Sequence, residues 1–174
     1  MSGTPRVEMV QYGTIYSNLD DLDTDITYTK EKDTHNFHVN THLVDIDQQT
    51  PIQGSIPLSM DYIYSKQGVT IKMDHCPYSA YMVLPVIASP SDVTEVGSKN
   101  MRIRKENGTL EISCVNGHFK VAPTDADGRI FNPVPGFSFI PLQVFPESPS
   151  KKIIVKIIYL SLIHISEPTR HSLI

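Results

Sequence analysis

The sequence predicts an all-β protein, an antiparallel β-sandwich, with an up-and-down β-barrel as the alternative. Two observations favour this fold class. Several short segments alternate apolar and polar residues with a period of two, and 13 Pro and 9 Gly residues are spread along the chain as turn signals. No segment shows the apolar period of a convincing helix. With 174 residues, 40% of them hydrophobic and 20% charged, the chain can bury a core of its own.

The expected strands follow one another through the middle and the C-terminal half of the chain. They cover residues 36–43, 58–65, 69–73, 81–88, 101–104, 110–114, 119–121, 136–145 and 152–158. In the first strand, Phe37, Val39 and Leu43 face the expected core and alternate with polar residues. Residues 81–88 form a continuous apolar run, which predicts a strand buried on both faces, with Pro85 at a bulge or an edge.

The turns between these strands have their own signals. Residues 66–68 predict a hairpin between the second and third strands. The pairs Asn107-Gly108 and Asn116-Gly117 predict two further hairpin turns, because both central residues of a type I′ turn need positive φ. Three successive strands should therefore form a meander.

The domain boundaries are placed where the alternation stops. Residues 1–25 include an acidic run without an apolar period and are predicted to be an N-terminal linker or fragment edge, so that the sandwich covers residues 26–159. The start of the chain lacks the features of a signal peptide, and the cellular location stays open. Cys76 and Cys114 are the only cysteines and are expected to be buried thiols, with one bridge as the alternative.

Residues 160–174 are predicted to be a non-native tail. Residues 160–170 read LSLIHISEPTR, which resembles, residue by residue, the translation of a transposase-type sequencing-library adapter. The last four residues also fit, because the adapter continues with a codon that begins with C, two arbitrary codons from the sample index and an Ile codon. We therefore exclude this tail from any site argument and expect the chain to be a fragment from a mixed, metagenomic sample.

Composition and motifs exclude several classes of function. Fifteen Lys and Arg against nineteen Asp and Glu give a net charge of −4, which argues against nucleic acid or an anionic membrane as a partner. His38 and His42 lie about 13 Å apart along one strand, too far to share a metal ion. The segment from Asp125 to Gly128 lacks the distant Glu of a calcium loop. We expect no metal, no cofactor and no complete catalytic motif.

The candidate ligand-binding residues are polar and aromatic side chains without an expected role in the core. They are His38, Asn40, His42, His75, Tyr78, Tyr81 and Arg129. Imidazole and amide groups are costly to bury without partners, so the polar face of the first strand should meet solvent or a neighbouring domain. Arg129 could clamp a carboxylate, with a surface ion pair as the alternative. Tyr62 and Tyr64 share the apolar face and are expected to be core residues.

The order of these segments resembles that of a known family. The segments FHVNTHL at 37–43, a Tyr-x-Tyr strand before Gly-Val-Thr-Ile, VLPVI at 83–87 and RIFNPVPG at 129–136 resemble the β-sandwich of heparinase II/III-like polysaccharide lyases and related carbohydrate-active enzymes. The resemblance implies an accessory C-terminal sandwich that acts on polysaccharide only together with an upstream catalytic domain, which this sequence lacks. It assigns no catalytic residue, and we expect no turnover from this chain alone. The alternative is a non-enzymatic carbohydrate-binding or adhesion module.

Overall fold

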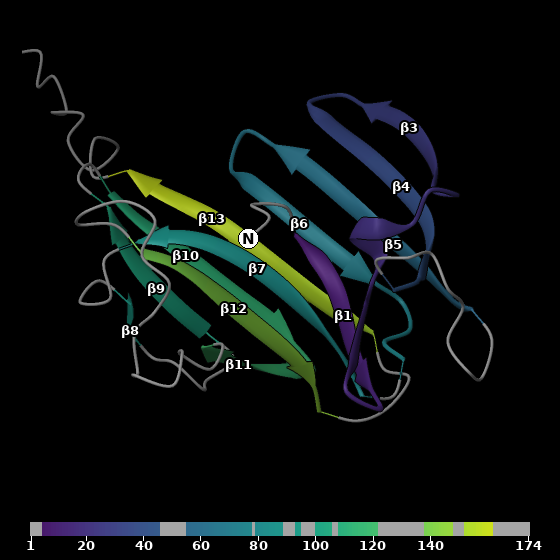
Figure 1. The fold of residues 1–174 in the computed structure, drawn as a ribbon. Coiled ribbons are helices and arrows are strands. Elements are labelled where there is room, and N and C mark those ends of the chain that lie inside the picture. Colours follow the sequence, from purple (N-terminus) through teal and green to yellow (C-terminus); the bar gives the residue numbers. More distant parts are fainter. Residues whose placement is uncertain are drawn as a thin grey trace, which may run out of the picture.

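The protein is a sandwich of two antiparallel β-sheets (Figure 1). The computed structural model describes residues 5–45, 55–77, 79–88, 93–94, 100–105, 108–121, 138–147 and 152–161. One sheet has five strands in the order β11-β12-β7-β1-β2, and the other has eight in the order β3-β4-β5-β6-β13-β10-β9-β8. The predicted antiparallel β-sandwich is confirmed, because the strands form two separate sheets and do not close into one.

The predicted strand segments agree with the observed bounds to within about three residues, whereas the strands at residues 6–11, 14–17, 25–31 and 93–94 were not predicted. The five-stranded sheet contains β1 (Arg6–Gln11), β2 (Thr14–Ser17), β7 (Ala80–Ala88), β11 (Gly117–Val121) and β12 (Ser138–Pro146). The eight-stranded sheet contains β3 (Asp25–Glu31), β4 (Thr34–Leu43), β5 (Ile56–Ser65), β6 (Gly68–Met73), β8 (Val93–Thr94), β9 (Asn100–Lys105), β10 (Gly108–Val115) and β13 (Ile153–Ser161). A 3-10 turn, η1 (Asn18–Asp20), follows β2. No helix in the described part of the chain is long and apolar enough to cross a membrane.

The core lies between the two sheets and is built largely from alternate residues of the strands, except β3. Its largest fully buried side chains are Phe119, Leu43, Met60, Ile71, Met73, Met82, Leu84, Met101, Ile112 and Leu142. Cys76 and Cys114 are both buried thiols, and no disulfide joins them. Burial of the Cys76 thiol raises its pKa to about 11, which leaves it protonated near neutral pH.

The N-terminal segment differs from the expectation. The sequence predicts a linker over residues 1–25, but β1 pairs with both β7 and β2 in the structure. Val7 is completely buried, and Met9 and Tyr16 belong to the core. Residues 6–17 are therefore part of the sandwich. The two strands are too short for a clear alternation beside the acidic run, and only the pairing of β1 with β7 and with β2 reveals them.

The predicted three-strand meander is wrong at its last step. β9 and β10 pair as expected, but β11 pairs with β12 in the other sheet. Asn116 has a φ of 59°, whereas Gly117 does not have positive φ, so the pair does not form a type I′ turn. A Cβ atom on Gly117 would lie 2.7 Å from the carbonyl oxygen of Phe145, which explains the glycine by close approach. The chain crosses between sheets here.

Strand β7 meets the expectation of burial on both faces, since Met82, Val83 and Leu84 are consecutive and all buried. Pro85 does not lie at an outer edge of the sheet, because β7 runs between β12 and β1. The pairing of β1 with β7 extends only over residues 80–83, so Pro85 needs no backbone donor on the β1 side.

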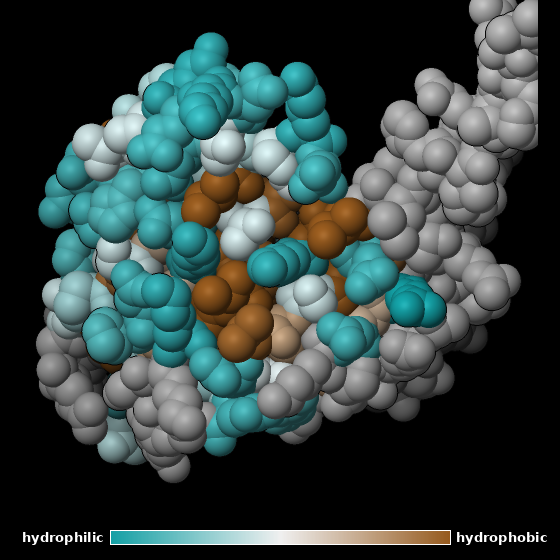
Figure 2. Space-filling model, turned by 180° about the vertical axis from the view of Figure 1, so that it is seen from behind, coloured by the Kyte–Doolittle hydropathy of each residue, from teal (hydrophilic) through white to brown (hydrophobic). Residues whose placement is uncertain are grey.

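The eight-stranded sheet is wider than its partner, and β3 forms its outer edge (Figure 1). All seven residues of β3 are exposed, on both faces of the strand. Apolar side chains reach the surface elsewhere too: seen from behind, the molecule carries an apolar patch surrounded by hydrophilic residues (Figure 2). The uncovered inner face of β3 to β5 is the part that bears on function.

Candidate functional site

The outer face of β4 and β5 carries a histidine held by a carboxylate. His38 lies opposite Asp61 in the pairing of the two strands, and its Nδ1 is 2.9 Å from Asp61 Oδ1. Ser59 Oγ lies 3.3 Å from His38 Nε2, and Asn36 Nδ2 donates to Asp61 Oδ1 at 3.4 Å. Both ring nitrogens of His38 therefore have partners, which fixes the orientation of the ring.

The order Ser59, His38 and Asp61 is that of a nucleophile, a base and an orienting acid. Such a set also needs donors for an oxyanion and a site that excludes water. Here the backbone groups of β4 and β5 are used in the sheet ladder, and the side chains of His38 and Asp61 are 40% and 28% exposed. The two cavities described below, beside β3 and β5, are not lined by these residues. The arrangement orients a histidine without assembling a centre for acyl transfer.

His42 takes part in a second polar cluster, at the edge of β4 just beyond its pairing with β3. The Thr41 hydroxyl and the His42 backbone N–H each donate to Asp21 Oδ2 at 2.8 Å, and the His42 ring lies 3.4 Å from the same oxygen. The Asp23 backbone N–H donates to Asp21 Oδ1. The Asp21 side chain is only 4% exposed, so this cluster fastens the loop before β3 onto β4.

The pKa of Asp21 reflects two opposing effects. Its removal from water raises the pKa, but the hydrogen bonds from Thr41, Asp23 and His42 together outweigh this effect and lower the pKa below its ordinary value of 3.8. The carboxyl is therefore ionised at neutral pH, as the donors around it require.

The other predicted residues do not gather around His38. Asn40 is exposed on the same strand, and His75 is exposed in the segment after β6. Tyr81 lies on β7 in the other sheet, where its hydroxyl donates to Glu8 Oε2 at 3.1 Å. Tyr78 and Arg129 lie outside the described residues. The structure thus places His38, Asn40 and His42 on one strand and Tyr81 apart from them, and ligand binding by this set stays a prediction.

Tyr81 belongs to a row of rings on the five-stranded sheet. It stacks on Phe145 with 5.0 Å between ring centroids, and His118 stacks on the other side of Phe145 at 5.7 Å. Burial, and then the charge and hydrogen bond of Glu8, raise the pKa of Tyr81 to about 12. The hydroxyl therefore stays protonated and donates, and Tyr81 has a clear structural role.

The sequence did not reveal an aromatic surface on the inner face of β3, β4 and β5, which we define as Tyr28, His35, Phe37, Tyr62 and Tyr64. Tyr28, Phe37 and Tyr64 are 52%, 37% and 44% exposed. The ring of Phe37 lies 5.1 Å from that of Tyr28 and 5.8 Å from that of Tyr64, and Tyr28 stacks on His35. The Tyr28 hydroxyl lies 2.8 Å from His35 Nδ1. The rings thus hold one another in place.

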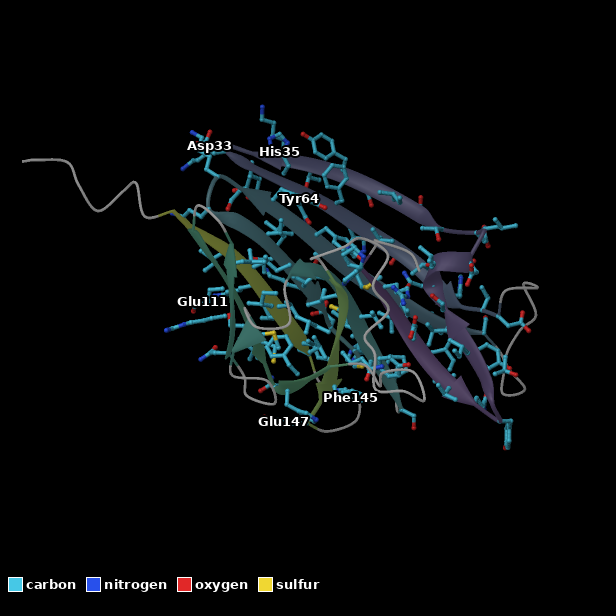
Figure 3. All side chains as sticks on the ribbon, turned by 60° about the vertical axis from the view of Figure 1, so that its left-hand side comes forward. Asp33, His35, Tyr64, Glu111, Phe145 and Glu147 are labelled. Atoms are coloured by element: carbon cyan, nitrogen blue, oxygen red, sulfur yellow. The ribbon has the colours of Figure 1, made fainter. Side chains whose placement is uncertain are left out.

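Two cavities adjoin the aromatic surface. A cavity of about 310 Å³ at the hairpin end is lined by Lys30, Lys32, Asp33, His35, Tyr64, Ser65 and Lys66. A second, of about 470 Å³, is lined by Pro5, Asn18, Leu19, Asp21, Thr24, Ile26, Phe37, Val39, Tyr62 and Tyr64. Tyr64 lines both. Figure 3 shows Asp33, His35 and Tyr64 together at this end of the sheet.

The expectation that Phe37 and Tyr64 are core residues is wrong, although Tyr62 does pack against the core. Burial of Tyr62, with a smaller contribution from Tyr64, raises its pKa to about 12. Alternation correctly assigned these rings to the inner face. It could not show that Phe37 and Tyr64 stay exposed, because burial depends on what lies opposite the strand.

The fold and these surfaces define a β-sandwich module, and its described residues hold no cluster of three or more potential metal ligands. The chain belongs to the ulvan lyase C-terminal domain family, whose model matches residues 1–160. It is 26% identical over 157 residues to a broad-specificity ulvan lyase of Formosa agariphila. That match covers 87% of this chain and 24% of the relative, so the chain spans about a quarter of the relative's length. No solved structure shows a significant match.

The family assignment supports the broader part of the sequence resemblance. This chain is a domain related to polysaccharide lyases. The narrower relation to heparinase II/III-like enzymes stays a prediction.

Proposed function

We propose that this chain acts as an accessory β-sandwich of a polysaccharide lyase, with the chemistry performed by an upstream catalytic domain of the parent protein. The observation that carries the proposal is the match of the ulvan lyase C-terminal domain model over residues 1–160. The relative in Formosa agariphila supports it, because the matched part is 24% of a protein named as a lyase.

The geometry of the described residues supports a non-catalytic role for the chain alone. The best-organised candidate set, Ser59, His38 and Asp61, lies on an open sheet face and outside both cavities. Catalysis needs an acid, a base and a bound substrate held together in one site that excludes water. An accessory domain without its catalytic domain does not hold these groups together.

A narrower form of the proposal places a helical toroid upstream, as in heparinase II/III-like lyases, and treats residues 160–174 as adapter-derived. The order of strand segments supports the first part, and the adapter-like reading LSLIHISEPTR supports the second. An uninterrupted open reading frame from the same source tests both. Tandem β domains upstream, or a wall anchor, would contradict the lyase proposal and favour an adhesion module.

Activity of the parent protein gives the direct test. We expect the parent to release unsaturated products from an acidic polysaccharide, followed by ultraviolet absorbance, and this chain alone to release none. Removal of this domain from the parent should lower turnover or stability. A parent without lyase activity on any acidic polysaccharide would contradict the proposal.

The outer face of β4 is the proposed contact with the catalytic domain or its substrate. In the parent, His38→Ala should lower turnover with little change in melting temperature, because His38 is 40% exposed. His42→Ala should also lower the melting temperature, because His42 contacts the buried Asp21. Parental turnover in both variants would show that this face is ordinary solvent-exposed sheet.

A further inference from the structure

We propose that the aromatic surface on the inner face of β3 to β5 binds an anionic polysaccharide directly. Sugar rings would lie on Phe37 and Tyr64, and acidic substituents would lie beside Lys30, Lys32 and Lys66. The inference deepens the proposed function and rests on it for polysaccharide as the class of ligand. The site differs from the outer face with His38, which the sequence indicated.

The first argument is the exposure of rings that are already ordered. Tyr28, Phe37 and Tyr64 present large apolar areas to water, and such areas in a folded protein mark contact surfaces. Centroid distances of 5.1 Å and 5.8 Å show that Phe37 packs against both neighbours. Because the rings are held by one another, a sugar that binds them loses less free energy to ordering of side chains.

The second argument is charge. The cavity at the hairpin end is lined by Lys30, Lys32 and Lys66 and by one carboxylate, Asp33. This local excess of positive charge stands out in a chain with a net charge of −4. Lys66 pairs with Asp33 at 3.0 Å, but their side chains are 83% and 75% exposed. An exposed pair of this kind contributes little, so a carboxylate or sulfate group of a ligand can replace Asp33.

The third argument is continuity. Tyr64 lines both the lysine-rich cavity and the apolar cavity beside Phe37 and Val39. One ring therefore connects a place for an anionic group with a place for an apolar sugar face, as a chain of acidic sugars requires. A second copy of this protein is the competing occupant of the surface, and the test below distinguishes the two.

Binding of the full chain to polysaccharides of different charge tests the inference. The probes are polygalacturonate, dextran sulfate and uncharged dextran, compared by affinity electrophoresis and calorimetry. We expect binding to the two anionic chains that weakens with added salt, and none to dextran. The double variants Y28A/Y64A and K30Q/K66Q should each weaken binding about tenfold or more. Matched controls, Tyr12→Ala in the β1–β2 turn and Lys156→Gln on β13, should bind as wild type.

The outcomes separate this inference from the proposed function. Loss of affinity in both double variants, with unchanged melting temperatures, supports the site. Wild-type affinity in the folded double variants, or no binding of wild type to either anionic chain, overturns it even if the parent is a lyase. Concentration-dependent dimerisation that Y28A/Y64A abolishes would also overturn it, since the surface would then be a self-association interface. Where a double variant does not fold, the milder Y64S and K66Q are measured instead.

Discussion

At the scale of single residues, Asp21 shows how one buried carboxylate fastens a loop to a sheet. Its two oxygens accept hydrogen bonds from the Thr41 hydroxyl and from the backbone N–H groups of Asp23 and His42. An uncharged amide in its place would lose charge-assisted bonds and bring an NH2 group toward these donors. We expect Asp21→Asn to lower the free energy of unfolding by about 1–3 kcal/mol at neutral pH.

The pH dependence of this effect has a definite sign. Because the pKa of Asp21 is lowered from 3.8 in the folded protein, its stabilising contribution is complete above that value and is lost as the pH falls through the folded pKa. The difference between wild type and Asp21→Asn should therefore shrink in acid. Urea unfolding at neutral pH and near pH 3 measures it, with the exposed Asp25→Asn as control. A difference that stays constant with pH would contradict this account.

At the scale of elements, the β5–β6 hairpin depends on one glycine. Gly68 has a φ of 147°, and an added Cβ atom would lie 1.9 Å from the carbonyl oxygen of Ile157 on the neighbouring β13. Gly68→Ala should therefore lower stability by roughly 3 kcal/mol or more, through both strain and the clash. Gly13→Ala is the matched control, since Gly13 has a φ of 82° but no atom within 4 Å of the added Cβ.

The two alanine variants separate the two causes. Gly13→Ala should cost about 1 kcal/mol, from backbone strain alone. Thermal and urea unfolding of both variants give the comparison. Equal losses would show that the contact with β13 is not the reason for glycine at this turn.

At the scale of the whole molecule, the N-terminal strands are expected to be essential for folding. Deletion of residues 1–17 removes three core side chains, those of Val7, Met9 and Tyr16. It also removes β1, which pairs with β7. Loss of one large apolar side chain costs about 2–5 kcal/mol. The combined cost of losing three should therefore exceed the free energy of unfolding of an ordinary domain. Circular dichroism and solubility measure it, with Val7→Ala as the milder variant. A deletion protein that melts like wild type would restore the linker interpretation.

Truncation after Ser161 should have the opposite result. The paired part of β13 ends at this residue, opposite Gly108, and the family model matches the chain up to residue 160. If residues 160–174 are adapter-derived, removal of residues 162–174, which keeps the paired Leu160 and Ser161, should leave the melting temperature and the solubility unchanged or improved. A drop of several degrees on truncation would contradict the non-native origin of the tail.

The sequence predicts which face of β4 a side chain occupies, but not which residues on other strands it meets. Alternation placed His38 on the outer face and Phe37 on the inner face, since it depends only on neighbouring residues. It could not pair His38 with Asp61, because strand register between segments 23 residues apart is set by the turn and by packing. The sequence likewise does not show that β7, which carries Tyr81, belongs to a different sheet from His38.

The sequence by itself determined the two-faced strands, their approximate bounds and the β-sandwich class, because the side-chain period of a strand is a local property. Tertiary structure decided which strands share a sheet, sending β11 across from β10 and bringing β1 and β2 into the core. It also decided that Phe37 and Tyr64 remain exposed. Whether an inward-facing side chain is buried depends on the sheet that lies opposite it. Here a five-stranded sheet faces an eight-stranded one. The same inward-facing pattern therefore forms a core in one part of the sheet and an open aromatic surface in another.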